Sequence, residues 1–333
     1  MAGFIRVEKI ALTIHNMGKS KKNLLVAQFV LLFSIAALGQ STADSSAIML
    51  SKDPAKPAVQ LSSSVYKINS WGVGIFSVVA TAANLYAIPT IIHGKRDLTM
   101  AELESLNTLV PNDIDRWSLK QDPSKRSSFY KASDITLPTI IISAATLGFD
   151  KAIRKDWAKL LLMFYEMHAF TFAIYDFSPF GPAFQNRIRP VAYYDYFPLS
   201  ERLGGNNRNS LYSGHVASAA ASTFFMVKVY SDYHPEIGKK RFLLYGLASI
   251  PPLVEGYLRI RALAHFPSDV VVGFVIGAVC GVAIPEMHRK PKSMQIGLYS
   301  SGGSNGLSFN WKLGKKEKPL KMLPDVANYK PAY

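Results

Sequence analysis

The chain has 333 residues, of which 49% are hydrophobic and 18% charged, and its formal net charge is +15. This length suits one large core and does not require a second domain. The positive charge favours an anionic partner such as a lipid headgroup, a phosphate ester or a nucleic acid. The single cysteine, Cys280, excludes an internal disulfide and any metal cluster built on cysteines.

The amino terminus has the pattern of a secretory signal. Three lysines precede the apolar run Leu24 to Leu38, which ends in small residues at Gly39. The run is shorter than the roughly 20 residues that span a bilayer. We predict a signal peptide over residues 1–39, or an uncleaved anchor, followed by a flexible lead-in over 40–70. The protein would then lie in the cell envelope, in the inner membrane or the periplasm.

Six apolar segments predict an all-α core, a six-helix bundle, over residues 71–290. They are Trp71 to His93, Asp134 to Phe149, Trp157 to Phe177, Ser213 to Tyr230, Arg241 to Tyr257 and Pro267 to Met287. The second is shorter than the roughly 20 residues of a membrane span, so we expect it not to cross comfortably. A further amphipathic helix is expected over Asp97 to Leu109. The pattern leaves open whether the bundle is soluble or membrane-spanning.

The tail, residues 291–333, carries a different pattern. Two alternating runs, Met294 to Ser300 and Gly306 to Leu313, flank the turn-forming sequence Ser-Gly-Gly-Ser-Asn. Alternation around such a turn predicts a β-hairpin. The lysines that follow it predict a basic, solvated end.

Three short segments concentrate the chemically active side chains. The first is Arg187-Ile188-Arg189-Pro190, after the third helix, and the second is Ser213-Gly214-His215, at the start of the fourth. The third runs from Arg259 through His265 to Asp269, where the sixth helix begins. In an antiparallel bundle the third helix ends at the face where the fourth and sixth begin. We therefore expect all three segments to meet.

Their residue types fit a phosphoryl group. Guanidinium groups match phosphate oxygens in bidentate fashion, and an uncrowded helix start at Gly214 offers free N–H groups to an anion. Ser213 is expected to cap that helix. Asp269 can accept a hydrogen bond from one nitrogen of His265 and leave the other to attack phosphorus, while His215 protonates the leaving oxygen. Because the arginines neutralise the charge, neither a metal nor a cofactor is required.

At these residues the chain resembles the type 2 phosphatidic acid phosphatase (PAP2) superfamily. The signature of that family is Lys-(six residues)-Arg-Pro, then Pro-Ser-Gly-His, then Ser-Arg-(five residues)-His-(three residues)-Asp. The resemblance covers about Trp71 to Arg289 and implies a six-helix core. It implies that His265 is the nucleophile, Asp269 its orienter and His215 the general acid. The implied phosphate ligands are Arg189, Arg259, Ser213 and Gly214.

The sequence departs from the family pattern at three positions. Pro182 stands where the family has its lysine, Tyr212 replaces the proline of the second motif, and Leu258 replaces the serine of the third. Only the lysine carries charge, and its loss removes a phosphate contact worth a few kcal/mol of transition-state binding. Our hypothesis is that Arg187 supplies the missing cation.

We therefore expect a metal-independent phosphatase that hydrolyses a monoester or diphosphate, of a lipid or of a small molecule, through a phosphohistidine. Membrane lipids are the expected partners; neither a nucleic acid nor a protein partner is indicated. Three alternatives remain open. They are a soluble periplasmic acid phosphatase acting on small esters, a degenerate bundle that binds phospholipid without catalysis, and a vanadate-dependent haloperoxidase.

Overall fold

The computed structural model describes residues 64–106, 111–290, 294–301 and 304–311. The predicted signal segment and most of the lead-in lie outside the described residues. The chain forms two compact units, one ending at His288 and one beginning at Arg289. Each is described by itself.

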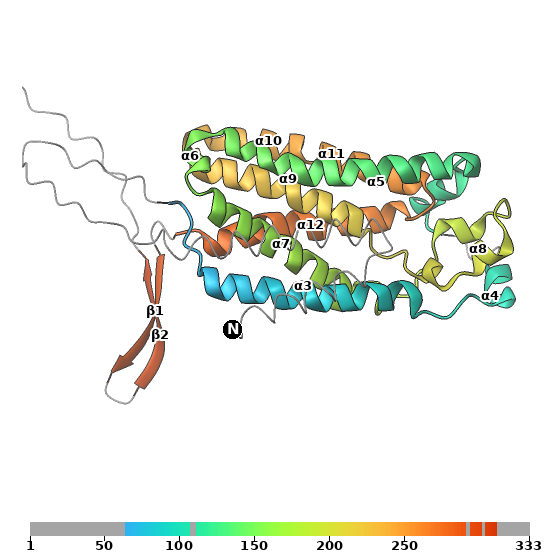
Figure 1. Cartoon of the computed structure of the whole chain (residues 1–333), viewed down its shortest axis with the longest axis horizontal. Coiled ribbons are helices and arrows are strands. Elements are labelled where there is room, and N and C mark those ends of the chain that lie inside the picture. Colours follow the sequence, from blue (N-terminus) through green and yellow to red (C-terminus); the bar gives the residue numbers. More distant parts are fainter. Residues whose placement is uncertain (1–63, 107–110, 291–293, 302–303, 312–333) are drawn as a thin grey trace, which may run out of the picture. The chain divides into compact units, whose positions relative to one another are not determined.

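The first unit is a bundle of long helices (Figure 1). They are α3 (Ser70–His93), α5 (Arg126–Ser143), α7 (Trp157–Phe177), α9 (Gly214–Tyr233), α10 (Arg241–Ala248), α11 (Ile250–Arg261) and α12 (Pro267–His288). Shorter helices α4 (Met100–Ser105), α6 (Lys151–Arg154) and α8 (Leu199–Leu203) lie between them. The all-α core that the sequence predicts is confirmed. Within the amphipathic stretch expected over Asp97 to Leu109, only α4 is helical among the described residues.

The second long helix begins eight residues earlier than expected. The side chain of Asp122 accepts a hydrogen bond from the N–H of Ser124, and a 3-10 turn from Pro123 runs directly into α5. With the 3-10 segment Ala144–Phe149, the whole stretch Pro123–Phe149 has 27 residues. It is long enough to cross a membrane, so the expectation of a short second helix was wrong. The polar residues of its first turns had the pattern of a loop.

The fifth segment is two helices rather than one. Pro251 and Pro252 lie in the first turn of α11, where a missing N–H costs no hydrogen bond. The same prolines could not continue the hydrogen-bond ladder of α10, so the helix breaks at Ser249. Helix α11 then continues past the predicted end at Tyr257 as far as Arg261, which places Arg259 in its last turn.

Three stretches of the described chain are long and apolar enough to cross a membrane. They are Ser70–His93, Pro123–Phe149 and Pro267–His288, with mean hydropathies of 1.8, 1.4 and 2.2. Many apolar side chains on the outer faces of the bundle are exposed, among them Trp71, Phe242 and Val279. Apolar surface of this extent marks a face that meets protein or lipid.

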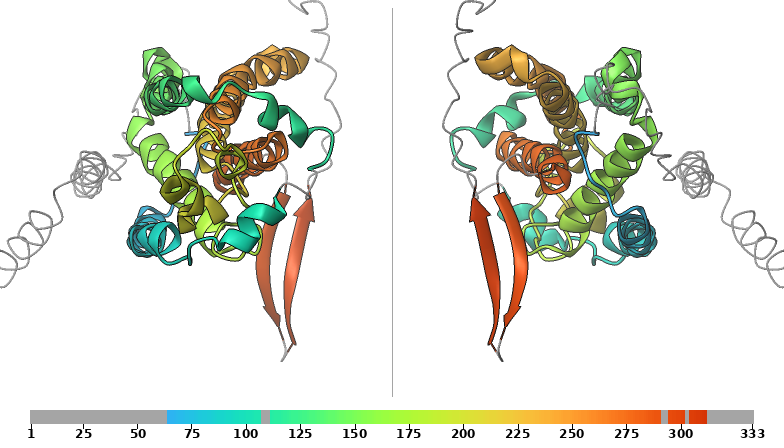
Figure 2. Two further views of the ribbon diagram at one scale, coloured as in Figure 1. Left: turned by 90° about the vertical axis from the view of Figure 1, so that its right-hand side faces the viewer. Right: turned by 90° about the vertical axis from the view of Figure 1, so that its left-hand side faces the viewer.

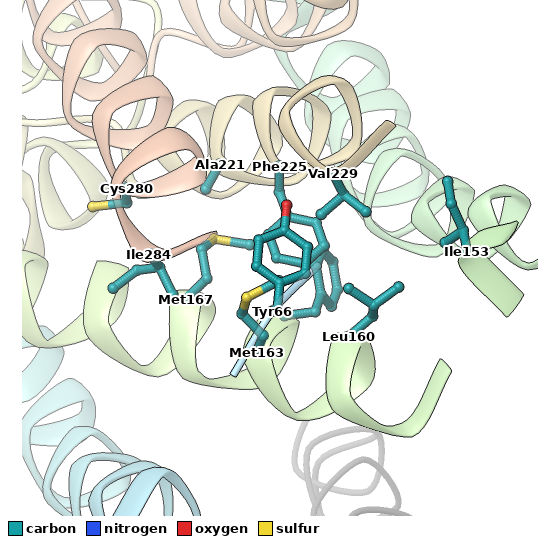
Figure 3. Packing of buried hydrophobic residues seen from close by; sticks show 11 residues of the cluster. Tyr66, Ile153, Leu160, Met163, Met167, Ala221, Phe225, Val229, Cys280 and Ile284 are labelled. Carbon is teal, nitrogen blue, oxygen red and sulfur yellow. The ribbon is translucent and has the colours of Figure 1, made fainter. Parts of the chain in front are cut away.

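Helix α9 is the central helix, since it contacts α5, α7, α10, α11 and α12. End-on views show the long helices side by side (Figure 2). The main hydrophobic cluster joins α7, α9 and α12 with Tyr66 from the start of the described chain (Figure 3). Met163, Met167 and Phe225 are almost completely buried within it. The cluster lies in the half of the bundle away from the predicted site, and it holds α7, α9 and α12 against one another.

Helices α9 and α12 pack unusually closely because α12 carries a glycine every fourth residue. A Cβ atom added at Gly273 would lie 2.5 Å from the carbonyl oxygen of Ser213. At Gly277 it would lie 2.1 Å from the carbonyl oxygen of Ala217, and at Gly281 2.5 Å from that of Ala221. Only glycine permits this approach, which sets the spacing between the first turns of the two helices.

The second unit contains two antiparallel strands, β1 (Met294–Ser301) and β2 (Ser304–Trp311). Met294 pairs with Trp311 at one end and Ser301 with Ser304 at the other. The strands occupy the stretch in which the sequence predicts a hairpin, with a second strand that begins two residues earlier.

Candidate active site

The three predicted segments lie at one end of the bundle, where α7 ends and where α9 and α12 begin (Figure 1). The loop from Ser178 to Ser213 crosses this end and holds itself by main-chain hydrogen bonds. The N–H of Arg189 donates to the carbonyl of Asn207 at 2.7 Å, and the N–H of Ser210 donates to that of Arg187 at 3.0 Å. These bonds bring Arg189 and Ser210 together although 21 positions separate them in sequence.

His265 is held by a main-chain carbonyl. Its Nδ1 lies 2.6 Å from the carbonyl oxygen of Ser210, and the residue is 2% exposed. A carbonyl oxygen can only accept, so Nδ1 carries the proton and the lone pair is on Nε2. The ring is thus in the tautomer that a nucleophilic Nε2 requires.

Asp269 does not make the expected hydrogen bond to His265, because its nearest oxygen lies 4.0 Å from Nδ1. Its Oδ2 instead accepts from the hydroxyl of Ser210 at 2.6 Å and from the N–H of Phe266 at 2.8 Å. The carboxylate therefore supports both residues that flank the imidazole: Ser210, whose carbonyl binds it, and Phe266, which follows it in the chain. The expectation of direct orientation is corrected to an indirect one.

Two arginines of the signature lie near the histidines, Arg259 buried and Arg189 partly buried. Arg189 directs Nε and one terminal nitrogen to the carbonyl of Asn209, at 3.3 and 3.2 Å. Arg259 is 3% exposed and makes only long contacts, at 3.5 Å to the hydroxyl of Ser133 and 3.4 Å to that of Tyr130. Its Nε has no hydrogen-bond partner among the described residues. A buried guanidinium with spare donors is suited to an anion.

The first turn of α9 also has spare donors. Ser213 does not cap the helix, contrary to expectation; its hydroxyl is buried and has no partner among the described residues. Its own N–H donates to the carbonyl of Asp269 at 3.1 Å, which turns the side chain away from the capping position. The uncapped amides therefore keep their positive potential. A Cβ at Gly214 would lie 3.2 Å from the ring of Tyr175, so this approach is crowded for any larger residue.

The second histidine, His215, lies in the same turn of α9. Its side chain is one third exposed, and its Nε2 lies 3.9 Å from a carboxylate oxygen of Asp134 on α5. Burial and then the charge of Arg259 lower the pKa of His215 to about 4, against the opposing effect of Asp134. Its exposed edge leaves it able to exchange protons with bound substrate or water.

Electrostatic coupling shows that these groups share one region. Burial, followed by the charges of Arg259 and Arg189, holds the pKa of His265 well below its usual value, and His215 acts in the same direction. Both imidazoles are consequently neutral at pH 7 while no anion is bound. An anion bound between the two guanidinium groups would offset their positive charge and raise the pKa of both imidazoles.

Arg187 has partners other than the expected phosphate. Its guanidinium lies 2.5 Å from a carboxylate oxygen of Asp115 and 2.5 Å from one of Asp269, and both carboxylates are fully buried. It also stacks on the ring of Phe266, 4.6 Å from the ring centre. The two carboxylate counterions argue against our hypothesis that Arg187 supplies the missing cation.

Several residues of this region were missed by the sequence analysis. Tyr130, Ser133 and Asp134 come from the first turns of α5, which had been assigned to a loop or to a helix start. Asp115 lies outside the three motifs, yet it is 0% exposed. No group of three or more metal-binding side chains occurs among the described residues.

A family model agrees with the signature. The family model described as "PAP2 superfamily" matches residues 143–293. No curated protein matches the chain. A solved structure, that of a transmembrane PAP2 type phosphatidylglycerolphosphate phosphatase from Bacillus subtilis, is 20% identical, with 65% of this chain and 94% of that chain covered. Its TM-score of 0.35 does not establish a common fold.

Proposed function

We propose that the chain is a metal-independent phosphatase acting through a phosphohistidine at His265, on the basis of the PAP2 superfamily model that matches residues 143–293. The observation that carries the proposal is the tautomer of that residue. Nδ1 donates to the carbonyl of Ser210, so Nε2 is an unprotonated nucleophile in a region that also contains Arg189 and Arg259. Burial and the two guanidinium charges keep the imidazole neutral, which preserves the lone pair.

In the first chemical step Nε2 of His265 forms a bond to phosphorus as the bond from phosphorus to the ester oxygen breaks. His215, protonated in the complex, donates its proton to the leaving oxygen and becomes neutral. In the second step His215 takes a proton from water, the water oxygen bonds to phosphorus, and the P–N bond breaks. Inorganic phosphate leaves and both histidines return to their initial protonation states.

Four groups would stabilise the charge that develops on the phosphoryl oxygens. They are the guanidinium groups of Arg189 and Arg259, the hydroxyl of Ser213 and the free amides at Gly214. The unpartnered Nε of Arg259 and hydroxyl of Ser213 support this assignment, because buried donors without partners are rare in folded proteins. Removing one such donor typically reduces kcat by about 10²–10³.

We propose a lipid phosphate or lipid diphosphate as the substrate, with the bundle embedded in the membrane of the cell envelope. Three apolar stretches that can cross a bilayer support this choice over a soluble acid phosphatase. Two of these stretches, Pro123–Phe149 and Pro267–His288, have their first turns beside the candidate site, so a substrate anchored in lipid could present its headgroup there.

The test is hydrolysis of p-nitrophenyl phosphate and of phosphatidic acid in detergent micelles, with a chelator present. We expect vanadate-sensitive release of phosphate that His265→Ala abolishes and His168→Ala leaves largely intact, since His168 is a buried histidine bonded to Ser222 in the middle of the bundle. If the chain binds vanadate but hydrolyses neither ester, it is the non-catalytic phospholipid-binding bundle. The reason to consider that alternative is Pro182, which stands where the family has its lysine. Equal rates for wild type and His265→Ala would refute the mechanism.

A further inference from the structure

The structure assigns to Asp115 the role of a positioning residue for the nucleophile, acting through Arg187 and Ser268 on Asp269 and His265. This inference rests on the proposed function, because it names the support of the same site. Asp115 lies on the 3-10 helix η2 (Asp115–Lys120), far from the signature segments in sequence. It belongs to none of the three motifs.

Both carboxylate oxygens of Asp115 are committed to the start of α12. Oδ1 accepts from the N–H of Ser268 at 2.9 Å, and Oδ2 accepts from the hydroxyl of Ser268 at 2.8 Å. Pro267 has no N–H and Asp269 bonds back to Phe266, so Asp115 satisfies an amide of this turn that would otherwise be unpaired. A residue from η2 thus completes the cap of a helix more than 150 positions later.

Arg187 links this cap to Asp269. One terminal nitrogen reaches Oδ2 of Asp115, and the other reaches the hydroxyl of Ser268 and Oδ1 of Asp269. A guanidinium group is planar and rigid, so it fixes the two carboxylates relative to each other. Hydrogen bonds from Ser268 and the charge of Arg187 lower the pKa of Asp115, although burial alone would raise it, so the carboxylate is ionised at pH 7.

The path from Asp115 to the nucleophile is continuous. Arg187 holds Oδ1 of Asp269, whose Oδ2 binds the hydroxyl of Ser210 and the N–H of Phe266. Ser210 in turn supplies the carbonyl that accepts from His265. Asp115 bonds to Arg187 and Ser268 and not to His265, so it acts by holding other residues in place.

The substitution Asp115→Asn removes the negative charge of the side chain and keeps its size and shape. The amide retains one acceptor for Ser268 but presents a donor to Arg187 or to the Ser268 hydroxyl, which are donors themselves. Arg187 and Ser268 would shift, and a displacement of about 1 Å at a reacting group can cost about 100-fold in rate. The matched control is Asp113→Asn, because Asp113 lies in the same segment but its side chain is 89% exposed and pairs only with the exposed Arg116.

The experiment is a pre-steady-state burst of p-nitrophenol from excess p-nitrophenyl phosphate, with the full chain in detergent micelles. The burst amplitude counts competent sites, and the burst rate reports attack by His265. We expect Asp115→Asn to slow the burst about 10- to 100-fold at unchanged amplitude, while Asp113→Asn matches wild type. A reduced amplitude at unchanged rate would mean that Asp115 only supports folding, and an unchanged burst would mean that it has no role; either result overturns the inference.

Two outcomes separate this inference from the function beneath it. If wild type releases no p-nitrophenol, the proposed function fails and the inference with it; if wild type gives a burst that Asp115→Asn does not slow, only the inference fails. If Asp115→Asn yields no folded protein, Ser268→Ala decides. It removes the hydroxyl between Asp115 and Arg187 while its N–H still bonds to Asp115. We expect a several-fold slower burst at full amplitude, and an unchanged rate would overturn the inference.

Discussion

The close approach of α9 and α12 predicts that the same glycine substitution has different effects at two positions. A Cβ atom at Gly273 would lie 2.5 Å from the carbonyl oxygen of Ser213, and a Cβ atom at Gly281 would lie 2.5 Å from that of Ala221. The shortest contact is therefore equal at the two positions, and Gly281 adds contacts of 2.9 Å to the main-chain nitrogen of Phe225 and 3.0 Å to the Cβ of Phe224. Gly273 faces the residue that begins the candidate site, whereas Gly281 lies eight residues farther along α12.

The expected magnitudes follow from the geometry. A carbon and a carbonyl oxygen approach to about 3.3 Å at closest, so alanine at either position must push the helices apart by roughly 0.8 Å. Overpacking of this kind costs about 1–3 kcal/mol of stability. Eight residues of helix correspond to about 12 Å, which separates the second clash from the catalytic groups. Gly273→Ala should lower kcat by about 100-fold and Gly281→Ala by far less, because only the first displaces Ser213 directly.

Thermal unfolding and p-nitrophenyl phosphate hydrolysis in one detergent measure both quantities. Gly246→Ala is the matched control, since a Cβ on this helical glycine meets nothing within 4 Å. It should keep full activity and gain up to about 1 kcal/mol of stability from the better helix propensity of alanine. If Gly273→Ala retains the kcat of Gly281→Ala, close packing of α9 on α12 does not set the geometry of the site, and the reasoning is refuted.

Two further predictions concern charge. Because the pKa of His215 is about 4 in the empty site, binding of a phosphate dianion should raise that pKa and draw in a proton, so affinity for inorganic phosphate should fall as the pH rises from about 5 to 8. Calorimetry in two buffers of different ionisation enthalpy measures the uptake, which His215→Asn should remove; uptake equal to that of the variant would contradict this. At the other end of α9, Lys228 lies 2.5 Å from both Asp232 and Glu286, and Lys228→Met should cost about 3–5 kcal/mol of unfolding free energy by leaving buried Asp232 without its ammonium partner. Glu286→Gln should cost at most about 1 kcal/mol, because the Glu286 side chain is 55% exposed; equal losses would show that burial does not govern this pair.

The residue pattern was sufficient to predict the helical bundle and the convergence of the three motif segments at one end of it. Apolar runs have a definite length, and α7 has the predicted bounds, Trp157 to Phe177, at both ends. Helix order then determines which ends are adjacent, and the structure brings Arg189, His215 and His265 into one electrostatic region. The family model matching residues 143–293 agrees with the motifs quoted from the sequence.

The contacts between side chains could not be predicted in the same way. Asp115 meets Ser268 across 153 positions, and neither residue type nor spacing reveals such a pair. The partner of His265 is a main-chain carbonyl, and since every residue has one, the sequence does not indicate which carbonyl it is. The two counterions of Arg187, which we expected to supply the missing cation, could not be foreseen because they come from separate elements, η2 and α12.

The carbonyl of Ser210 has a consequence for how this site can evolve. Every amino acid has a carbonyl, so no single substitution at position 210 can delete the acceptor that sets the protonation of His265. Variation there would change only the hydroxyl that Asp269 receives. A substitution at position 210 therefore leaves the acceptor for the Nδ1 proton in place. It can still change how rigidly the carbonyl is held, because the hydroxyl that bonds to Asp269 would be lost.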